Sequence, residues 1–211
     1  MTFSGWFYKT FVDPLLVSVR EKIAAEIIAG QTVLDVACGT GALVFQLALK
    51  NKKVVGIDLS EPLIDAAKKE KQKQRLTNVG FEVADATRLS VFKDGEFDIV
   101  TLSMALHQFN PELHAPILDE IKRVGKKLII VDYAVPLPRN VAGISARIIE
   151  FLAGKEHYQN FRRYYGLGGL KPILSDKATE VESSQIFSSG IFTLATCNFQ
   201  STESYLYSKK S

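Results

Sequence analysis

The chain has little cysteine and no long apolar run, and these absences argue against a disulfide-linked, cysteine-metal or membrane-spanning protein. Its 211 residues include only two cysteines, Cys38 and Cys197, which are far apart and lack the short spacing of cysteine metal sites. We therefore expect no bound metal, and a reducing, cytoplasmic location. No apolar run approaches the roughly 20 residues that a membrane span requires. Residues 1–16 also lack the basic start and unbroken apolar stretch of a signal peptide.

An excess of charge of one sign is also nearly absent. The formal net charge is +3, from 26 lysines and arginines against 23 aspartates and glutamates, which is too mild to indicate a nucleic-acid partner. The basic run "KKEKQKQR" at residues 68–75 lies on a predicted helix, where lysines and glutamines cover a solvated face. Because no aromatic–basic platform or N-P-P-Y motif accompanies it, we expect a small-molecule substrate and no nucleic acid.

What the sequence does contain is a regular alternation of short apolar strands with helices. An Asp-Pro pair at residues 13–14 opens the first helix, and Pro116 is expected near the first turn of a later one. The five predicted strands cover residues 32–37, 53–59, 79–85, 97–106 and 126–135. This alternation predicts an α/β fold with a Rossmann-like, doubly wound and mostly parallel sheet.

The pattern changes after residue 135. Residues 136–170 contain a turn-rich connection and two helices, which we interpret as a lid insertion on the acceptor side of the site. Residues 181–200 predict two strands joined at Ser189-Gly190, a hairpin that adds an antiparallel C-terminal strand. We expect a single domain over residues 1–211, with residues 1–30 as an N-terminal cap helix.

The tightest glycine cluster is "VLDVACGTGAL", at residues 33–43. Gly39 and Gly41 permit a sharp bend between a strand and a helix, and let a ligand approach the backbone. In a doubly wound sheet this turn lies at the ligand-binding edge. A dinucleotide fingerprint would need a third glycine where this chain has Val44, and no P-loop lysine is present. Both features argue against a dinucleotide.

Aspartates end three successive predicted strands, at Asp35, Asp58 and Asp85. A carboxylate after the second strand can accept both hydroxyls of a ribose, and one after the third can accept from an adenine amine. Each acid alone is more often a cap or turn residue. The three together suit an adenosine that carries no pyrophosphate.

The segments "VLDVACGTGAL", "VVGIDLSEPLIDAAKK", "VGFEVADATRLSVFKDGEFDIVTLSMALHQF" and "EIKRVGKKLIIVDY" occur in that order. Over residues 11–135 the chain resembles the class I S-adenosylmethionine-dependent methyltransferases, and most closely the small-molecule branch that includes the ubiquinone and menaquinone C-methyltransferases. Two departures are Ala37, where many members have a glycine, and "VGKKL", where a Gly-Gly pair usually precedes the fifth strand.

The resemblance implies a seven-stranded sheet and S-adenosylmethionine as the cofactor. Asp35 and the backbone of residues 37–41 would hold the methionine, Asp58 the ribose, and Asp85 the adenine. Met104 would border the sulfonium and the acceptor. The complete set of implied cofactor-binding residues is Asp35, Ala37, Cys38, Gly39, Gly41, Asp58, Leu59, Asp85, Ala86 and Ser103.

The expected reaction transfers a methyl group to a small, apolar or aromatic acceptor. His107 is the candidate general base, with helix capping or cofactor-loop positioning as the alternative. Asp132 is a candidate substrate contact or a turn residue. Tyr8 in the N-terminal segment and His157 and Phe161 in the predicted lid are candidate substrate contacts or simple packing residues. The full set of candidate substrate contacts is Tyr8, Asp132, His157 and Phe161.

Two further expectations concern the whole protein. The short amphipathic segment at residues 144–154 is compatible with peripheral contact to a membrane, and no pattern indicates an oligomeric state. The alternative function is a non-catalytic protein that keeps the cofactor-binding fold, as a binding or scaffold protein.

Overall fold

The computed structural model describes residues 13–176 and 180–199. Tyr8, the candidate substrate contact of the N-terminal segment, lies outside these residues. The helices are α2 (Asp13–Glu26), α3 (Ala42–Ala48), α4 (Glu61–Gln74), η2 (Leu106–Gln108, a 3₁₀ turn), α5 (Pro111–Val124), α6 (Val141–Leu152), α7 (Lys155–Gly166) and α8 (Leu170–Asp176). The strands are β1 (Thr32–Val36), β2 (Lys53–Asp58), β3 (Val79–Val83), β4 (Ile99–Ser103), β5 (Lys127–Tyr133), β6 (Val181–Phe187) and β7 (Phe192–Asn198).

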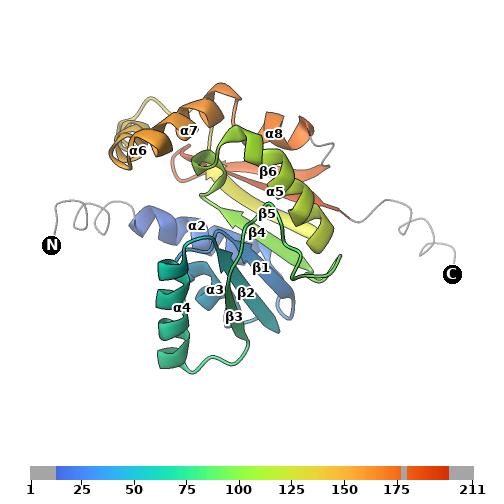
Figure 1. Cartoon of the computed structure of the whole chain (residues 1–211). Helices are drawn as coiled ribbons and strands as arrows, with labels where there is room; N and C mark the ends of the chain where they lie inside the picture. Colours follow the sequence, from blue (N-terminus) through green and yellow to red (C-terminus); the bar gives the residue numbers. More distant parts are fainter. Residues whose placement is uncertain (1–12, 177–179, 200–211) are drawn as a thin grey trace, which may run out of the picture.

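The strands form one sheet in the order β3-β2-β1-β4-β5-β7-β6 (Figure 1). Strands β1 to β5 pair in parallel, whereas β7 is antiparallel to both β5 and β6. The predicted seven-stranded, mostly parallel fold is confirmed. Chain order reverses between β1 and β4, so the ends of these two strands mark the edge where open α/β sheets bind ligands.

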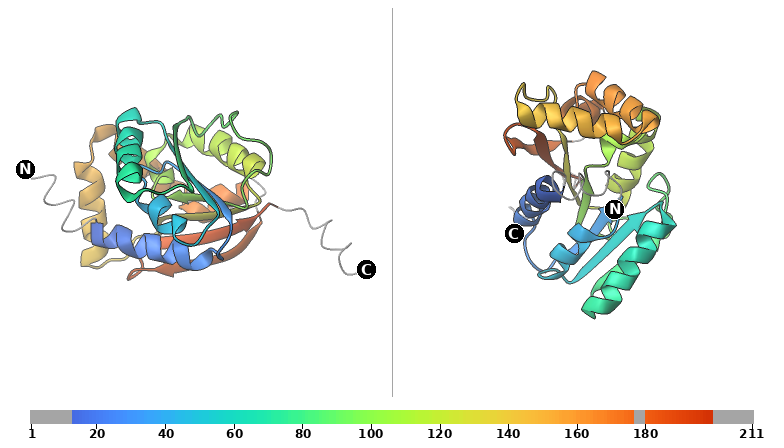
Figure 2. Two further views of the ribbon diagram at one scale, coloured as in Figure 1. Left: turned by 90° about the horizontal axis from the view of Figure 1, so that it is seen from below. Right: turned by 90° about the vertical axis from the view of Figure 1, so that its left-hand side faces the viewer.

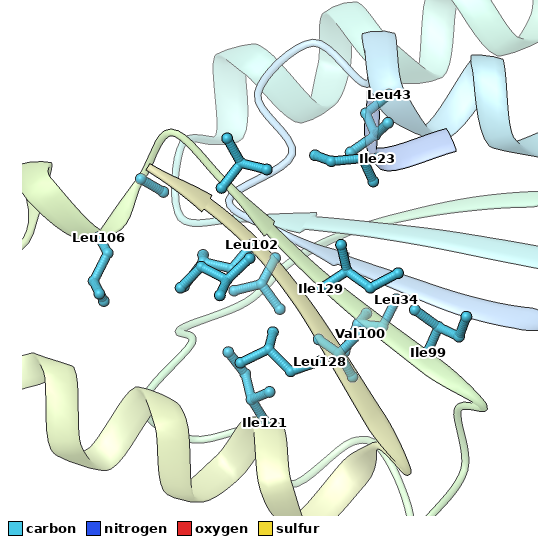
Figure 3. Packing of buried hydrophobic residues seen from close by; sticks show 14 of the residues in the cluster. Ile23, Leu34, Leu43, Ile99, Val100, Leu102, Leu106, Ile121, Leu128 and Ile129 are labelled. Carbon is cyan, nitrogen blue, oxygen red and sulfur yellow. The ribbon is translucent and has the colours of Figure 1, made fainter. Parts of the chain in front are cut away.

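The core lies on both faces of the sheet, because helices cover each side. Figure 3 shows Ile23 of α2 and Leu43 of α3 above the strands, and Ile121 of α5 below them. The strand residues between them, such as Leu34 and Ile129, are fully buried. This burial on two sides explains why the strands are continuous apolar runs rather than alternating ones.

One helix begins earlier than the sequence predicts. Asn110 caps α5 by accepting a hydrogen bond from the backbone of Glu112, and Pro111 takes the first helical position. Pro116 therefore lies inside the helix instead of near its first turn, and its missing N–H leaves one carbonyl of the preceding turn without a helical partner. The prediction was wrong because the earlier proline already occupies the favoured position.

Helices α6 and α7 follow β5 and lie beyond the carboxyl end of that strand (Figures 1 and 2). Two long-range hydrogen bonds attach α7 to the sheet. The hydroxyl of Tyr164 donates to the carbonyl of Tyr133 at 2.8 Å, and the amide of Asn160 donates to the carbonyl of Gln108 at 2.8 Å. No helix within the described residues is long and apolar enough to cross a bilayer.

Candidate functional site

Three residues of the turn after β1 adopt the left-handed backbone conformation, with φ of 56° at Ala37, 56° at Gly39 and 82° at Gly41. A Cβ on Gly39 would meet no atom within 4 Å, so open space adjoins this backbone. A Cβ on Gly41 would instead overlap the ring of Phe81. Gly41 is thus required by packing, while Gly39 lies beside space that a ligand can fill.

The missing third glycine has a structural explanation. Val44 is fully buried, and a Cβ on Gly56 of β2 would lie 2.9 Å from its methyl group and 2.8 Å from the sulfur of Cys38. In the dinucleotide fingerprint the last glycine lies on the helix and lets that helix pack closely against the sheet. In this chain Gly56 on strand β2 allows the same close packing of α3.

Asp58 is held by two backbone groups at the end of β2. One carboxylate oxygen accepts from the N–H of Gly39 at 2.8 Å, and the other accepts from the N–H of Ser60 at 2.9 Å. Each oxygen keeps a lone pair for a further donor. The neighbouring Leu59 is 73% exposed and does not line the cleft described below, so its implied contact with the cofactor stays a prediction.

Asp85 and Ala86 occupy a turn after β3. One oxygen of Asp85 accepts from the backbone N–H and the hydroxyl of Thr87, both at 2.8 Å. The side chain is exposed, and neither residue lines the cleft described below. The adenine contact that the sequence implies for this pair stays a prediction.

Asp35 ends β1 as a buried carboxyl with one hydrogen-bond partner, the hydroxyl of Thr101 at 2.7 Å. Burial raises the pKa of Asp35 to about 7, and the nearby carboxylate of Asp58 raises it further, while the bond from Thr101 opposes the shift. An ionised Asp35 is therefore costly in the free protein. A positively charged ligand in the adjoining cleft would remove that cost.

We expect Asp35→Asn to gain stability relative to the wild type as pH rises. The folded state keeps the proton up to about pH 7 whereas the unfolded chain releases it near 3.8, so the wild type alone loses stability across this window. From pH 5 to pH 8 the difference should grow by roughly 2–3 kcal/mol. Urea unfolding at both pH values measures it, with Asp65→Asn on the exposed face of α4 as the control. Parallel pH curves for wild type and Asp35→Asn would contradict the assignment.

A second polar cluster lies between η2, β5 and the helices α6 and α7 of the predicted lid segment. His107 is buried, and its Nδ1 lies 2.6 Å from one oxygen of Asp132, whose other oxygen accepts from the backbone N–H of His107 at 3.1 Å. Asp132 also accepts from the backbone N–H of Tyr133 at 2.7 Å. Asp132 is fully buried behind His107 and does not line the cleft, so it orients the imidazole.

The lid completes this cluster with Glu150 of α6 and His157 of α7. Glu150 accepts from the hydroxyl of Tyr133 at 2.8 Å, and its second oxygen lies 2.5 Å from Nε2 of His157. Nε2 of His107 lies 3.6 Å from Glu150. Phe161 is buried beside these rings and does not line the cleft. We call His107, Asp132, Tyr133, Glu150 and His157 the acceptor-side cluster.

Charge within the acceptor-side cluster is strongly coupled. Burial disfavours the imidazolium of His107, but Asp132 and Glu150 outweigh it and raise the pKa of His107 to about 9. Burial likewise favours neutral Glu150, but hydrogen bonds from His107 and His157 outweigh it and lower the pKa of Glu150 to about 2. Protonated His107 and ionised Glu150 therefore hold opposite charges beside the cleft.

One cleft of about 630 Å³ connects the glycine turn with the acceptor-side cluster. Six of the predicted cofactor-binding residues line it, namely Asp35, Ala37, Cys38, Gly39, Asp58 and Ser103, and Met104 lies with them. Gly41, Leu59, Asp85 and Ala86 do not line it. From the acceptor-side cluster, the cleft is lined by His107, Tyr133, Glu150 and His157.

Sequence reasoning missed four residues of the cleft that carry polar groups. Arg20 of α2 and Gln108 of η2 line it, as do Tyr133 and Glu150. Glu150 could have been identified from the pattern "IIEFLAGKEH". A glutamate within an otherwise apolar helix segment is rarely buried unless it has a partner, so it is a candidate for a buried polar site. Nothing in the local sequence of Arg20 distinguishes it from the solvated charges of its helix.

Curated relatives share part of this chain. A demethylmenaquinone methyltransferase of Beutenbergia cavernae is 36% identical over 110 residues, which cover 51% of this chain and 42% of the relative. A ubiquinone biosynthesis O-methyltransferase of Acinetobacter baylyi is 32% identical over 101 residues, covering 47% of this chain and 42% of the relative. The match thus spans less than half the length of these relatives.

Solved structures share the fold over most of the chain. A magnesium protoporphyrin IX methyltransferase from Synechocystis, solved with bound S-adenosylhomocysteine, has a TM-score of 0.63 at 20% identity and covers 94% of this chain and 88% of its own. A SAM-dependent methyltransferase from Aquifex aeolicus has a TM-score of 0.61 at 22% identity, covering 84% of this chain and 88% of its own. The family model described as a methyltransferase domain matches residues 27–166, which include the glycine turn, the strand-end aspartates and most of the lid. The chain belongs to this methyltransferase domain family.

Proposed function

We propose that this protein transfers a methyl group from S-adenosylmethionine to a small, apolar or aromatic acceptor. The observation that carries the proposal is one continuous cleft, which is lined by the glycine turn and Asp58 at one end and by four residues of the acceptor-side cluster at the other. Family membership supports the proposal. The low cysteine content supports a cytoplasmic location.

The residues of the turn side fit this cofactor. Asp58 offers two positioned oxygens for the ribose hydroxyls, and Gly39 leaves space beside the backbone. Asp35 would hold the positively charged amino group of the methionine, which stabilises the ionised carboxylate. Arg20 lines the same cleft and makes no ion pair with any residue in the described ranges, so we assign it the methionine carboxylate.

The cofactor supplies an activated methyl group on a sulfonium, so the protein contributes orientation and electrostatics. When bound, the cofactor would give up its methyl group to the acceptor atom as the carbon–sulfur bond breaks, and S-adenosylhomocysteine would leave. The sequence-predicted candidate base, His107, lies between two carboxylates. We assign it the stabilisation of negative charge on the acceptor, since both neighbours favour its positive form.

The test combines binding with turnover. Calorimetry should show that S-adenosylmethionine and its demethylated product bind with one site per chain, whereas NAD does not bind. A radiolabelled methyl group should then appear in a member of a panel of quinols and phenols. Absence of binding by either sulfur nucleotide would overturn the proposal. Binding without turnover on any acceptor would favour the scaffold alternative.

We also propose peripheral membrane contact through α6, in line with an apolar acceptor. Val141, Ile144, Ile148 and Phe151 lie on this helix with about half or more of each side chain exposed. Such a face is typical of a helix that rests in a lipid interface. Co-sedimentation with anionic vesicles should fall several-fold in Phe151→Ser, while the control Val91→Ser, an exposed valine far from α6 in the sequence, should sediment as the wild type. Equal sedimentation of all three proteins would contradict this contact.

A further inference from the structure

Three side chains of the acceptor-side cluster present metal-ligand atoms to one point. The atoms of His107, Glu150 and His157 all lie within 4.8 Å of one another. They come from η2, α6 and α7, so the fold and not local sequence spacing brings them together. Two imidazoles with one carboxylate form a donor set that suits zinc and other divalent first-row ions, and leaves a coordination position open.

Neighbouring side chains hydrogen-bond to the proposed ligands and orient them, as is usual at metal sites. Nδ1 of His107 is bound to Asp132, which leaves Nε2 to face Glu150. The hydroxyl of Tyr133 donates to Oε1 of Glu150, the same oxygen that faces Nε2 of His107. A carboxylate behind a ligating histidine fixes its tautomer and ring orientation, and is the usual outer partner of such a ligand. This buried support distinguishes the cluster from a chance grouping of surface acids.

The balance of charge favours the same conclusion. Asp132 and Glu150 are buried carboxylates, and within the described residues only histidines form ion pairs with them. Two carboxylates buried in one cluster require positive charge beside them. One divalent cation neutralises both.

We propose that His107, Glu150 and His157 bind one divalent transition-metal ion, with its open position toward the cleft. This inference rests on the proposed function and deepens its acceptor side: in the metal-bound protein the ion takes over the positive charge that His107 provides in the metal-free protein. The acceptor then carries an ionisable oxygen, such as a phenol or an enol, that reaches the ion. It also replaces the sequence-based expectation of no metal, which considered only cysteine spacing.

Metal binding is tested on the full chain after removal of metals with a chelator and without S-adenosylmethionine, so that its outcome is independent of cofactor binding. Calorimetry with zinc chloride should show one ion per chain, and magnesium chloride should show none. His157→Ala and Glu150→Gln should each lower zinc affinity at least about 100-fold. Asp132→Asn should lower it about 10- to 100-fold, since it acts through His107.

Two matched controls separate this site from other donors. His114→Gln removes the remaining histidine of the chain, and Cys38→Ser removes the thiol that lines the cleft; both should bind zinc as the wild type. Cobalt(II) added to the wild type should give visible bands of a nitrogen–oxygen site, and catechol, a probe with ionisable oxygens, should shift them. Unchanged zinc affinity in both ligand variants would overturn the proposal. A thiolate-to-cobalt charge-transfer band, or a wild type that binds no zinc, would also overturn it.

Discussion

Asp58→Ala should lower the affinity for S-adenosylmethionine at least about 100-fold. In the proposed function the carboxylate would offer one oxygen to each ribose hydroxyl, and a hydrogen bond to a charged group contributes about 1.5–3 kcal/mol. The same oxygens also anchor the N–H groups of Gly39 and Ser60, so the variant removes both the ligand contacts and the restraint on the turn. Calorimetric titration of S-adenosylhomocysteine, which is chemically stable, measures the effect directly.

Two further variants make this result interpretable. Asp65→Ala removes an exposed acid from α4, the helix that follows Asp58, and should bind as the wild type. Asp85→Ala tests the predicted adenine contact and should cost less than about tenfold, because its side chain is exposed and one oxygen is already used in a turn. A wild-type affinity in Asp58→Ala would show that the ribose does not lie at the end of β2.

The fold and the cofactor side of the cleft could be predicted from sequence because their signals are local. A buried parallel strand is a short apolar run, and a tight strand-to-helix turn needs glycine at fixed offsets. Asp35, Gly39 and Asp58 each follow such a run directly. Parallel strands then bring their carboxyl ends to one edge of the sheet, so topology alone places these residues together.

The acceptor side could be predicted only in part, because its residues meet through tertiary packing. The sequence identified His107 and His157 as candidates, but no spacing rule relates them to Glu150, which lies on a different helix from each. The sequence around Tyr133 is that of an ordinary strand, and only the fold shows that its hydroxyl donates to Glu150 of α6. The position of a lid helix over a sheet depends on side-chain packing between segments far apart in the chain, which a periodic pattern does not encode.

Aspartates at equivalent places in the fold can also have opposite energetic roles. Asp35 ends β1 and Asp132 lies near the end of β5, and both are buried. Asp35 accepts one hydroxyl and carries a raised pKa, whereas Asp132 accepts from three N–H groups. The ionised form of the first is disfavoured by its surroundings, whereas the second is stabilised by its hydrogen bonds and is part of the structure.

Asp132→Ala should therefore destabilise the protein by roughly 3–5 kcal/mol, because it leaves the backbone N–H groups of His107 and Tyr133 and the imidazole without their buried acceptor. Asp35→Ala is the matched control. It leaves only the hydroxyl of Thr101 without a partner and removes a buried charge at pH 8, so it should cost less than about 1 kcal/mol or stabilise the chain. Urea unfolding of both variants at pH 8, with the m-value checked for each, gives the comparison. An equal or larger loss for Asp35→Ala would mean that the network around Asp132 does not hold β5, η2 and the lid together.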